Sequence, residues 1–438
     1  MRLLQCRIFG FLLVCSVVFG QVVFSQAVAA STQETVAPSL EEIWKLIQQQ
    51  QTQIEKLESE LLGSQRRLEE AQIRWQADNQ AQSTRLAQTE EALEATVTAV
   101  EAVAFNDSGK QTNLGGYGEL HYNNLDNGKE IDLHRFVMFF SHQFNQELSF
   151  YSELEVEHSI AGDGQPGEVE IEQAFIQWDY ADNHRTRMGV YLVPVGILNE
   201  THEPDTFYGV ERNPVEKQII PSTWWEGGAV FDGEITPGWG YNVAAHSGLN
   251  LDTDNASASK RSSIRSARQK VAKANADSPA FTARIRFNGI AGLQWNTSLQ
   301  YQSDLTQDDA DGIGISGIDA TLFETNLSFQ RAGFSLRALY ARWDINDKIE
   351  LLNPGSNEQV GWFVEPSYRF DKLGLFMRYS SYDLTAGSNV TSNEKSQFDV
   401  GVNYWLYDTV VLKADFQRQD NDNGKDIDGF NLGVGYSF

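Results

Sequence analysis

The stretch GFNLGVGYSF, residues 429–438, decides the fold of this chain. Every second residue from Phe430 to Phe438 is large and apolar, and the residues between them are Asn, Gly, Gly and Ser. A pattern with a period of two residues places all of the apolar side chains on one face of a β-strand. The stretch therefore predicts a strand with one apolar and one polar face.

The same alternation recurs upstream, so we expect about 16 strands in all. They lie at residues 114–125, 130–143, 147–158, 168–181, 185–195, 224–235, 239–248, 280–288, 293–303, 318–329, 333–344, 359–371, 373–384, 395–406, 409–419 and 427–438. Short turns alternate with long connections, as in bacterial barrels with tight periplasmic turns and long external loops. An even count returns the C-terminus to the periplasmic side, and counts of fourteen and eighteen stay open. The sequence predicts an all-β transmembrane barrel with antiparallel strands.

The N-terminal segment predicts export from the cytoplasm. Arg2 and Arg7 precede an apolar run that ends in Ala27-Val28-Ala29, and this order is typical of a signal peptide over residues 1–29. Lipidation at Cys15 is the weaker alternative, because the preceding Val14 is larger than the usual residue there. Both cysteines lie in this segment, so we expect no disulfide in the mature chain. The formal net charge of −26 disfavours nucleic acid as a partner.

Residues 30–105 carry a different pattern. Apolar residues from Leu40 to Val103 recur with the heptad spacing of a coiled coil, and the register jumps by four residues beyond Gln82. We therefore expect an α-helical coiled coil in the periplasm, followed by the barrel over residues 106–438. A single solvated helix is the alternative interpretation of the same segment.

If the apolar face of each strand meets lipid, the other face lines the lumen. The predicted acids of the lumen are Glu153, Glu155 and Glu157. The predicted bases are Arg185, Arg187, Arg284, Arg286, Arg337, Arg369, Arg378 and Lys413. A barrel of this size is wide enough for an aqueous channel, and opposed charges across it would set an ion preference. Solvated side chains without a selective role are the alternative.

Two long connections carry charges of interest. The connection from Gly196 to Thr223 is expected to fold inward and narrow the pore, with a purely external loop as the alternative. Its charged residues are Glu200, Glu203, Asp205, Glu211, Arg212, Glu216 and Lys217. The connection after residue 249 forms an external basic loop with Lys260, Arg261, Arg265, Arg268, Lys270 and Lys273. Gathering of anions, contact with lipopolysaccharide phosphates and simple solvation are all open for this loop.

Catalytic and metal-binding motifs are weak. The sequence has neither G-x-S-x-G nor H-E-x-x-H, and the acidic stretches 308–312 and 420–424 do not follow the order of a calcium loop. We therefore expect no catalytic residue, no metal site and no cofactor.

Three stretches resemble the phosphate-selective porin O/P family, including relatives with an N-terminal periplasmic coiled coil. They are LGGYGELHY at residues 114–122, the passage from RMGVYLVPVG to STWWEGG at residues 187–228, and GVGYSF at residues 433–438. The resemblance implies a homotrimer of 16-stranded barrels with an inward third loop, lumenal arginines and a lysine cluster. Here the third loop is rich in acids, and Lys217 is its only lysine.

The leading hypothesis is a trimeric porin in the outer membrane of a Gram-negative bacterium. It would pass small hydrophilic solutes by diffusion, with a preference for anions, among outer-membrane lipid and lipopolysaccharide. The alternative is an envelope tether in which the coiled coil reaches peptidoglycan. A barrel enzyme is the least favoured hypothesis, because no nucleophile motif is found.

Overall fold

The computed structural model describes residues 112–438 except 309–313, 389–392 and 423, together with isolated helical residues between 41 and 72. Two units separate by their contacts, Met1–Leu93 and Glu94–Phe438. The predicted signal peptide lies outside the described residues. The predicted coiled coil is described only at those helical positions, so its heptad packing stays a prediction. Among the described residues, no helix has the length and apolar character needed to cross a membrane.

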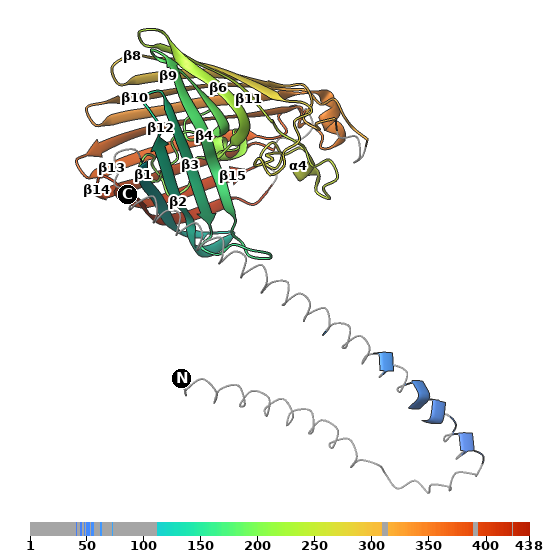
Figure 1. Cartoon of the computed structure of the whole chain (residues 1–438). Coiled ribbons are helices and arrows are strands. Elements are labelled where there is room, and N and C mark those ends of the chain that lie inside the picture. The colour runs from blue at the N-terminus through green and yellow to red at the C-terminus, as the bar shows by residue number, and fades with distance from the viewer. Residues whose placement is uncertain are drawn as a thin grey trace. The chain divides into compact units, whose positions relative to one another are not determined.

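Sixteen antiparallel strands form one closed barrel, in which each strand pairs with its neighbours in sequence and β1 pairs with β16 (Figure 1). The strands are β1 Thr112–Leu125, β2 Gly128–Gln143, β3 Leu148–Glu157, β4 Val169–Ala181, β5 His184–Leu192, β6 Trp225–Thr236, β7 Trp239–His246, β8 Ala280–Ile290, β9 Leu293–Gln302, β10 Ala320–Arg331, β11 Phe334–Ile345, β12 Glu358–Phe370, β13 Leu373–Asp383, β14 Lys395–Tyr407, β15 Val410–Asn421 and β16 Ile427–Ser437. Every predicted strand overlaps one of these, so the predicted barrel and its strand count are confirmed.

The seam between the first and last strands closes the barrel. Tyr117 lies opposite Ser437, and Leu125 lies opposite Gly429. Beyond the end of β16, the amide of Gly116 donates to the carbonyl of Phe438 at 3.0 Å, and the amide of Phe438 donates back at 2.8 Å. Closure leaves no strand edge with unpaired backbone groups, which is the condition for a β-structure to stand in lipid.

The two ends of the barrel differ in the length of their connections. At one end, which we call the turn end, neighbouring strands are joined by short turns, and β1 begins there beside the end of β16. Ala332 and Gly333 in one of these turns have φ of 51° and 84°, the left-handed values that a tight hairpin requires. The opposite, loop end carries the long connections after β3, β5, β7, β9, β11 and β13. This is the alternation that the sequence predicted.

Side chains alternate between the two faces of the barrel. Phe416 lies between Val400 and Phe430 on neighbouring strands, and this row is exposed on the outer face. On the inner face, Asp415 lies opposite Asn431, and both are buried. An outer surface covered by aromatic and aliphatic side chains is unfavourable in water and fits the hydrocarbon of a bilayer.

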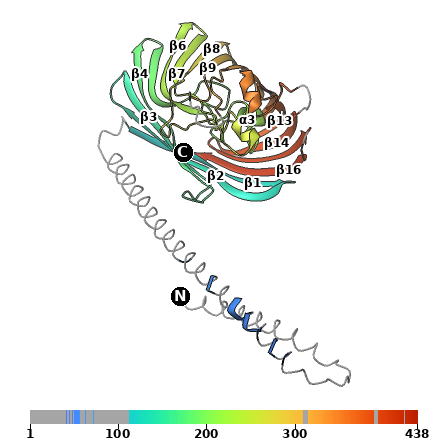
Figure 2. The same ribbon diagram turned by 90° about the vertical axis from the view of Figure 1, so that its right-hand side faces the viewer.

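The main buried apolar cluster lies inside the barrel. It combines residues of the third loop, 193–224, and of the fourth loop, 247–279, with inward residues of β10, β11 and β12. Trp224 and Trp343 are its largest fully buried side chains. Figure 2 shows loop segments and the short helix α3 (Pro214–Gln218) within the ring of strands. The loops therefore fill part of the lumen as a packed core.

The assignment of the two faces predicts unequal costs for charges on neighbouring residues of β15. Phe416→Arg places a cation in lipid near the middle of the strand, and we expect the free energy of unfolding to fall by about 2–4 kcal/mol. The matched change Gln417→Arg places the same group in the lumen and should cost much less. Urea titration of the protein folded into lipid vesicles measures both values. Equal losses would contradict the assignment.

Candidate functional site

The third loop crosses the lumen. It leaves the wall after β5 and returns to it at β6, yet its backbone is bound by strands on other sides of the barrel. The amide of Val210 donates to Asp415 on β15 at 2.6 Å, and Trp343 on β11 donates to the carbonyl of Ile219 at 2.9 Å. These contacts fix the inward fold that the sequence predicted for this connection.

Glu216 at the start of α3 organises the loop from within. Its buried carboxylate accepts hydrogen bonds from the amides of Ile197 at 2.6 Å and Leu198 at 2.7 Å, and from the side chain of Asn213 at 2.8 Å. Asn213 in turn caps the helix by accepting from the amide of Glu216 at 2.8 Å. This reciprocal arrangement satisfies backbone donors that water cannot reach.

The fourth loop packs onto the third. Arg265 donates to the carbonyls of Lys217 at 3.0 Å and Ser222 at 2.9 Å. Arg268 donates to the carbonyl of Thr223, and its guanidinium lies over the ring of Trp225. Because these arginines bind backbone oxygens, they lock the two loops together while keeping their positive charges inside the barrel.

The remaining basic residues of the fourth loop have other positions. Lys270 forms ion pairs with Glu168 and Glu170 at the start of β4. Arg261 donates to the carbonyl of Leu352 at 3.3 Å, in the loop after β11. Lys260 and Lys273 are exposed. The basic loop is thus divided between contacts inside the barrel and solvent.

A cavity of about 290 Å³ lies where these loops meet the wall, and we call it the mouth cavity. Its acids lie mainly on β1, the end of β3 and the start of β4, and its bases lie mainly on the two loops. The acids are Glu119, Glu157, Glu168, Glu170, Glu172 and Glu211, and the bases are Arg135, Arg212, Lys217, Arg265, Arg268 and Lys270. The six acids and six bases balance formally. Three of the bases pair directly with acids of the cavity: Arg135 with Glu119 at 2.8 Å, Lys217 with Glu211 at 3.6 Å, and Lys270 with Glu168 and Glu170.

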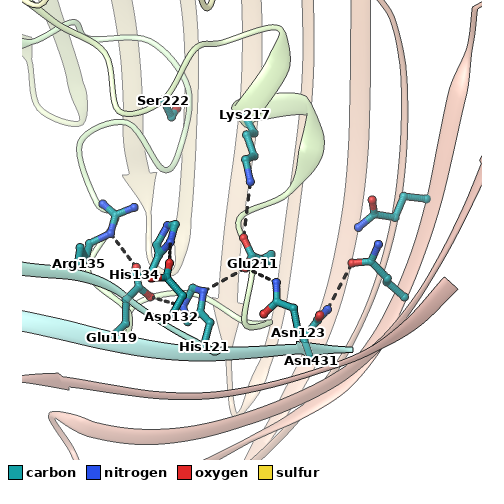
Figure 3. Close-up of polar contacts among 12 residues, drawn as sticks. Glu119, His121, Asn123, Asp132, His134, Arg135, Glu211, Lys217, Ser222 and Asn431 are labelled. Carbon is teal, nitrogen blue, oxygen red and sulfur yellow. Dashed lines mark hydrogen bonds and ion pairs between the residues drawn. The ribbon is translucent and has the colours of Figure 1, made fainter. Parts of the chain in front are cut away.

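Glu211 of the third loop is a centre of this arrangement (Figure 3). Its carboxylate lies 3.0 Å from the ring of His121, accepts from Asn123 at 3.0 Å and lies 3.6 Å from the ammonium of Lys217. Burial opposes the charge on Glu211, but Lys217 and His121 outweigh it and hold the pKa of the carboxyl well below its usual value. The loop is therefore tied to β1 by a charged acceptor.

A larger cavity of about 680 Å³ opens toward the turn end, and we call it the turn-end cavity. Arg284, Arg337 and Arg369 line it together with the acids Glu200 and Asp205. A side cavity of about 240 Å³ shares part of its lining and adds Arg185, Arg286 and Glu234. Phe207 of the third loop lines both the mouth cavity and the turn-end cavity, so the loop separates the two spaces.

Comparison with solved structures finds barrels that resemble this one. OmpF of Salmonella typhi aligns with 76% of this chain and 99% of its own at a TM-score of 0.53 and 15% identity. The outer membrane channel DcaP of Acinetobacter baumannii aligns with 75% of this chain and 97% of its own at a TM-score of 0.50 and 13% identity. At these identities the likeness shows the fold alone.

Sequence comparison gives information beyond the fold. An uncharacterized protein of Aquifex aeolicus (strain VF5) is 32% identical over 358 residues, which cover 75% of this chain and 80% of that protein. The family of Gram-negative porins matches residues 231–424. This match, which covers less than half of the chain, and the closed barrel together support a general outer-membrane porin. The chain is therefore an outer-membrane protein, and the finer resemblance to the porin O/P family stays a hypothesis.

The predicted bases of this porin all lie on the inner side of the wall, but several are neutralised there. Arg378 pairs with Asp399 at 3.0 Å and Glu365 at 3.2 Å, and Arg284 pairs with Glu200. Arg185 and Arg187 both lie beside Asp232, at 3.1 and 3.5 Å. A continuous ladder of free arginines is therefore not present along the described strands.

Other predicted bases contact a backbone carbonyl or an aromatic ring. Arg337 donates to the carbonyl of Thr206 at 2.7 Å, and Arg369 stacks over the ring of Trp405 at 4.1 Å, both within the turn-end cavity. Lys413 is buried, with its ammonium 3.6 Å from the centre of the Phe207 ring. Arg337 and Lys413 form no ion pair among the described residues, whereas the guanidinium of Arg369 lies 3.8 Å from the exposed carboxylate of Asp408.

Two of the predicted lumenal acids are covered. Glu153 and Glu155 face inward but are only 2% and 1% exposed, whereas Glu157 lines the mouth cavity. Glu155 lies 3.6 Å from Arg135, and Glu153 lies 3.6 Å from His202 of the third loop. The two acids do not line the open pore, because the third loop and β2 supply partners that cover them.

The remaining acids and bases of the third loop have separate partners. Asp205 accepts from Ser437 at 2.9 Å, and Arg212 donates to Thr223 at 2.8 Å. Glu203 is partly exposed, and its backbone carbonyl accepts from the amide of Thr206 at 3.0 Å. The charged side chains of the loop thus reach β16, the loop itself and the lumen rather than one common point.

The sequence prediction missed a group of lumenal residues on β1, on β2 and around the start of β4. These residues are Glu119, His121, His134, Arg135, Glu168, Glu170 and Glu172, and all of them line the mouth cavity. The signal was present, because the same period-two alternation that exposed Val169 and Ile171 on the outer face places their neighbours inside.

The central role of Glu216 gives a test of loop rigidity. Glu216→Ala leaves the amides of Ile197 and Leu198 without an acceptor, and we expect their hydrogen exchange to accelerate by at least about tenfold, the equivalent of ~1.4 kcal/mol. Glu216→Gln keeps a carbonyl acceptor and should show a smaller effect. Hydrogen exchange of the folded porin followed by mass spectrometry provides the measurement. Unchanged exchange in the alanine variant would show that the loop is held elsewhere.

Proposed function

We propose that this porin is a trimeric diffusion channel for small hydrophilic solutes, that its third loop forms the constriction, and that anions are favoured. The observation that carries the proposal is the course of the third loop, which crosses the lumen and separates two cavities lined by charged side chains. Passage is passive, because charged walls offer weak and repeated binding from which a solute can leave again.

The preference for anions follows from the charges that face the open spaces. The turn-end cavity and its side cavity together hold five bases, Arg185, Arg284, Arg286, Arg337 and Arg369, against the three acids Glu200, Asp205 and Glu234. Five minus three leaves a formal charge of +2 on the residues that line these two cavities, a count that does not include Asp232, the partner of Arg185 at 3.1 Å. The mouth cavity is formally neutral, so the excess at the turn end decides the sign.

The mouth cavity supplies a second property. Arg212, Arg265 and Arg268 of the two loops and Glu157 of β3 line it without an ion pair among the described residues, and the field of their charges would orient dipolar solutes before they pass the third loop. A solute that carries separated positive and negative groups can match this field. We therefore infer that zwitterionic and anionic solutes pass more readily than cationic ones of equal size.

The trimer rests on the resemblance to the porin O/P family and on the predicted coiled coil over residues 30–105. Heptad repeats of this length can associate three helices below three barrels. The tether hypothesis would use the same segment, but no contact within the described residues favours it. The signal peptide over residues 1–29 remains part of the proposed maturation.

The anion preference is tested in a planar lipid bilayer under a KCl gradient. We expect openings in three equal steps and a reversal potential that favours chloride. The double variant Arg337→Gln and Arg369→Gln removes two of the five bases and balances the acids, so its ratio of chloride to potassium permeability should fall toward about 1.

Arg418→Gln is the matched control, because Arg418 is exposed and pairs with Asp420 at 3.4 Å away from both cavities. This variant should keep the wild-type reversal potential. A potential that favours potassium in the wild type would instead assign selectivity to the acids of the mouth cavity. A single step in every opening would argue against the trimer, and absence of conductance would contradict the channel.

A further inference from the structure

Glu153, Glu172 and His202 form a buried cluster, of which Glu172 alone lines the mouth cavity. They come from β3, from β4 and from the third loop, and their side chains are 2%, 2% and 3% exposed. Nε2 of His202 lies 3.6 Å from Oε1 of Glu153 and 3.4 Å from Oε2 of Glu172. One ligand atom from each residue lies within 4.8 Å of both others.

The orientation of the imidazole ring is informative. Nδ1 of His202 lies 3.3 Å from the backbone carbonyl of Asn199, so Nδ1 carries a hydrogen and donates it. In the neutral ring, Nε2 then presents its lone pair to the two carboxylates. Neither Nε2 of His202 nor Oε2 of Glu172 has a hydrogen-bond partner. Three electron-rich atoms that face one another in a buried space require a cation between them.

We propose that Glu153, Glu172 and His202 bind a divalent transition-metal ion of the zinc type. Metal–ligand bonds of about 2.0–2.1 Å in a tetrahedral arrangement separate neighbouring ligand atoms by roughly 3.3 Å, close to the two distances from Nε2. A proton on Nε2 is the competing cation, but N–H···O bonds have their optimum near ~2.9 Å, so the observed separations suit an ion better.

The surroundings support this choice of metal. One imidazole nitrogen and two carboxylates form a donor set that suits zinc, cobalt or manganese better than calcium, which prefers oxygen ligands alone. The second oxygen of Glu153 accepts from Gln173 at 2.5 Å, and the bond from Nδ1 to Asn199 fixes the ring. Such second-shell contacts orient ligands in known metal sites.

The site has an entry route and an open position. Glu172 lines the mouth cavity, so an ion and a completing water molecule can approach from the lumen. Glu155 and Arg135 lie on the same side of the barrel and pair with each other at 3.6 Å, which leaves the cluster itself with an excess of negative charge. A bound ion would fasten the third loop at His202 to the wall at β3 and β4.

The test uses the folded full-length porin, freed of metal with a chelator and then equilibrated with Zn²⁺ or Co²⁺. We expect one ion per chain by elemental analysis, and visible absorption bands of four-coordinate Co²⁺. His202→Gln and Glu172→Gln should each weaken binding by about 100-fold or more, because loss of a second-shell contact alone costs about 10- to 100-fold.

Two histidine variants serve as matched controls. His246 is buried, and its Nε2 lies 3.0 Å from the hydroxyl of Thr282, so His246→Gln should bind the ion as the wild type does. His158 belongs to a second cluster with Asp132 and His134, so His158→Gln should also retain binding.

Three outcomes would overturn the proposal. The first is absence of stoichiometric binding by the wild type, which is independent of how any variant folds. The second is unchanged binding after His202→Gln. The third is loss of binding in His158→Gln alone, which would assign the ion to the second cluster.

Discussion

The hydrogen bonds between neighbouring strands are the constraint on which the rest of the structure depends. A backbone amide or carbonyl in hydrocarbon has no water to bind, so every strand must be paired on both sides. The pairing of Tyr117 with Ser437 at the seam meets this demand by closing the sheet on itself. Closure also fixes the two faces, since alternate side chains must then point to lipid or to the lumen.

A closed barrel of this width creates a second problem, because inward side chains of the strands alone cannot fill it. The third and fourth loops supply the missing volume. Trp224 and Ile264 of these loops pack with Trp343 of the wall in one apolar cluster inside the barrel. The remaining space is split into separate cavities, so the same packing that stabilises the loops also shapes the route through the lumen.

The sequence predicted the strands, the unequal ends and the inward third loop, because each of these follows from local patterns. Alternation and turn composition are properties of neighbouring residues. Whether an inward side chain stays exposed to the lumen depends instead on residues that are far away in the sequence. Glu153 was predicted to line the pore, but His202 lies 3.6 Å from it. No sequence pattern near either residue predicts this contact. Irregular pairing, as between Glu119 and Leu120, also moves side chains in ways that a strict period of two does not describe.

The division of the lumenal charges follows from the same distant contacts. Arg378 and Arg284 were predicted from alternation, and both face inward, yet carboxylates beside them cancel their fields at short range. Arg337 instead donates to a backbone carbonyl and forms no ion pair among the described residues. Arg369 lies over an aromatic ring and 3.8 Å from the exposed carboxylate of Asp408. A count of inward charges therefore overstates the field that a solute meets. In the proposed channel a solute would meet the mouth cavity and then the turn-end cavity, where Arg337 forms no ion pair among the described residues and keeps its positive charge toward the lumen.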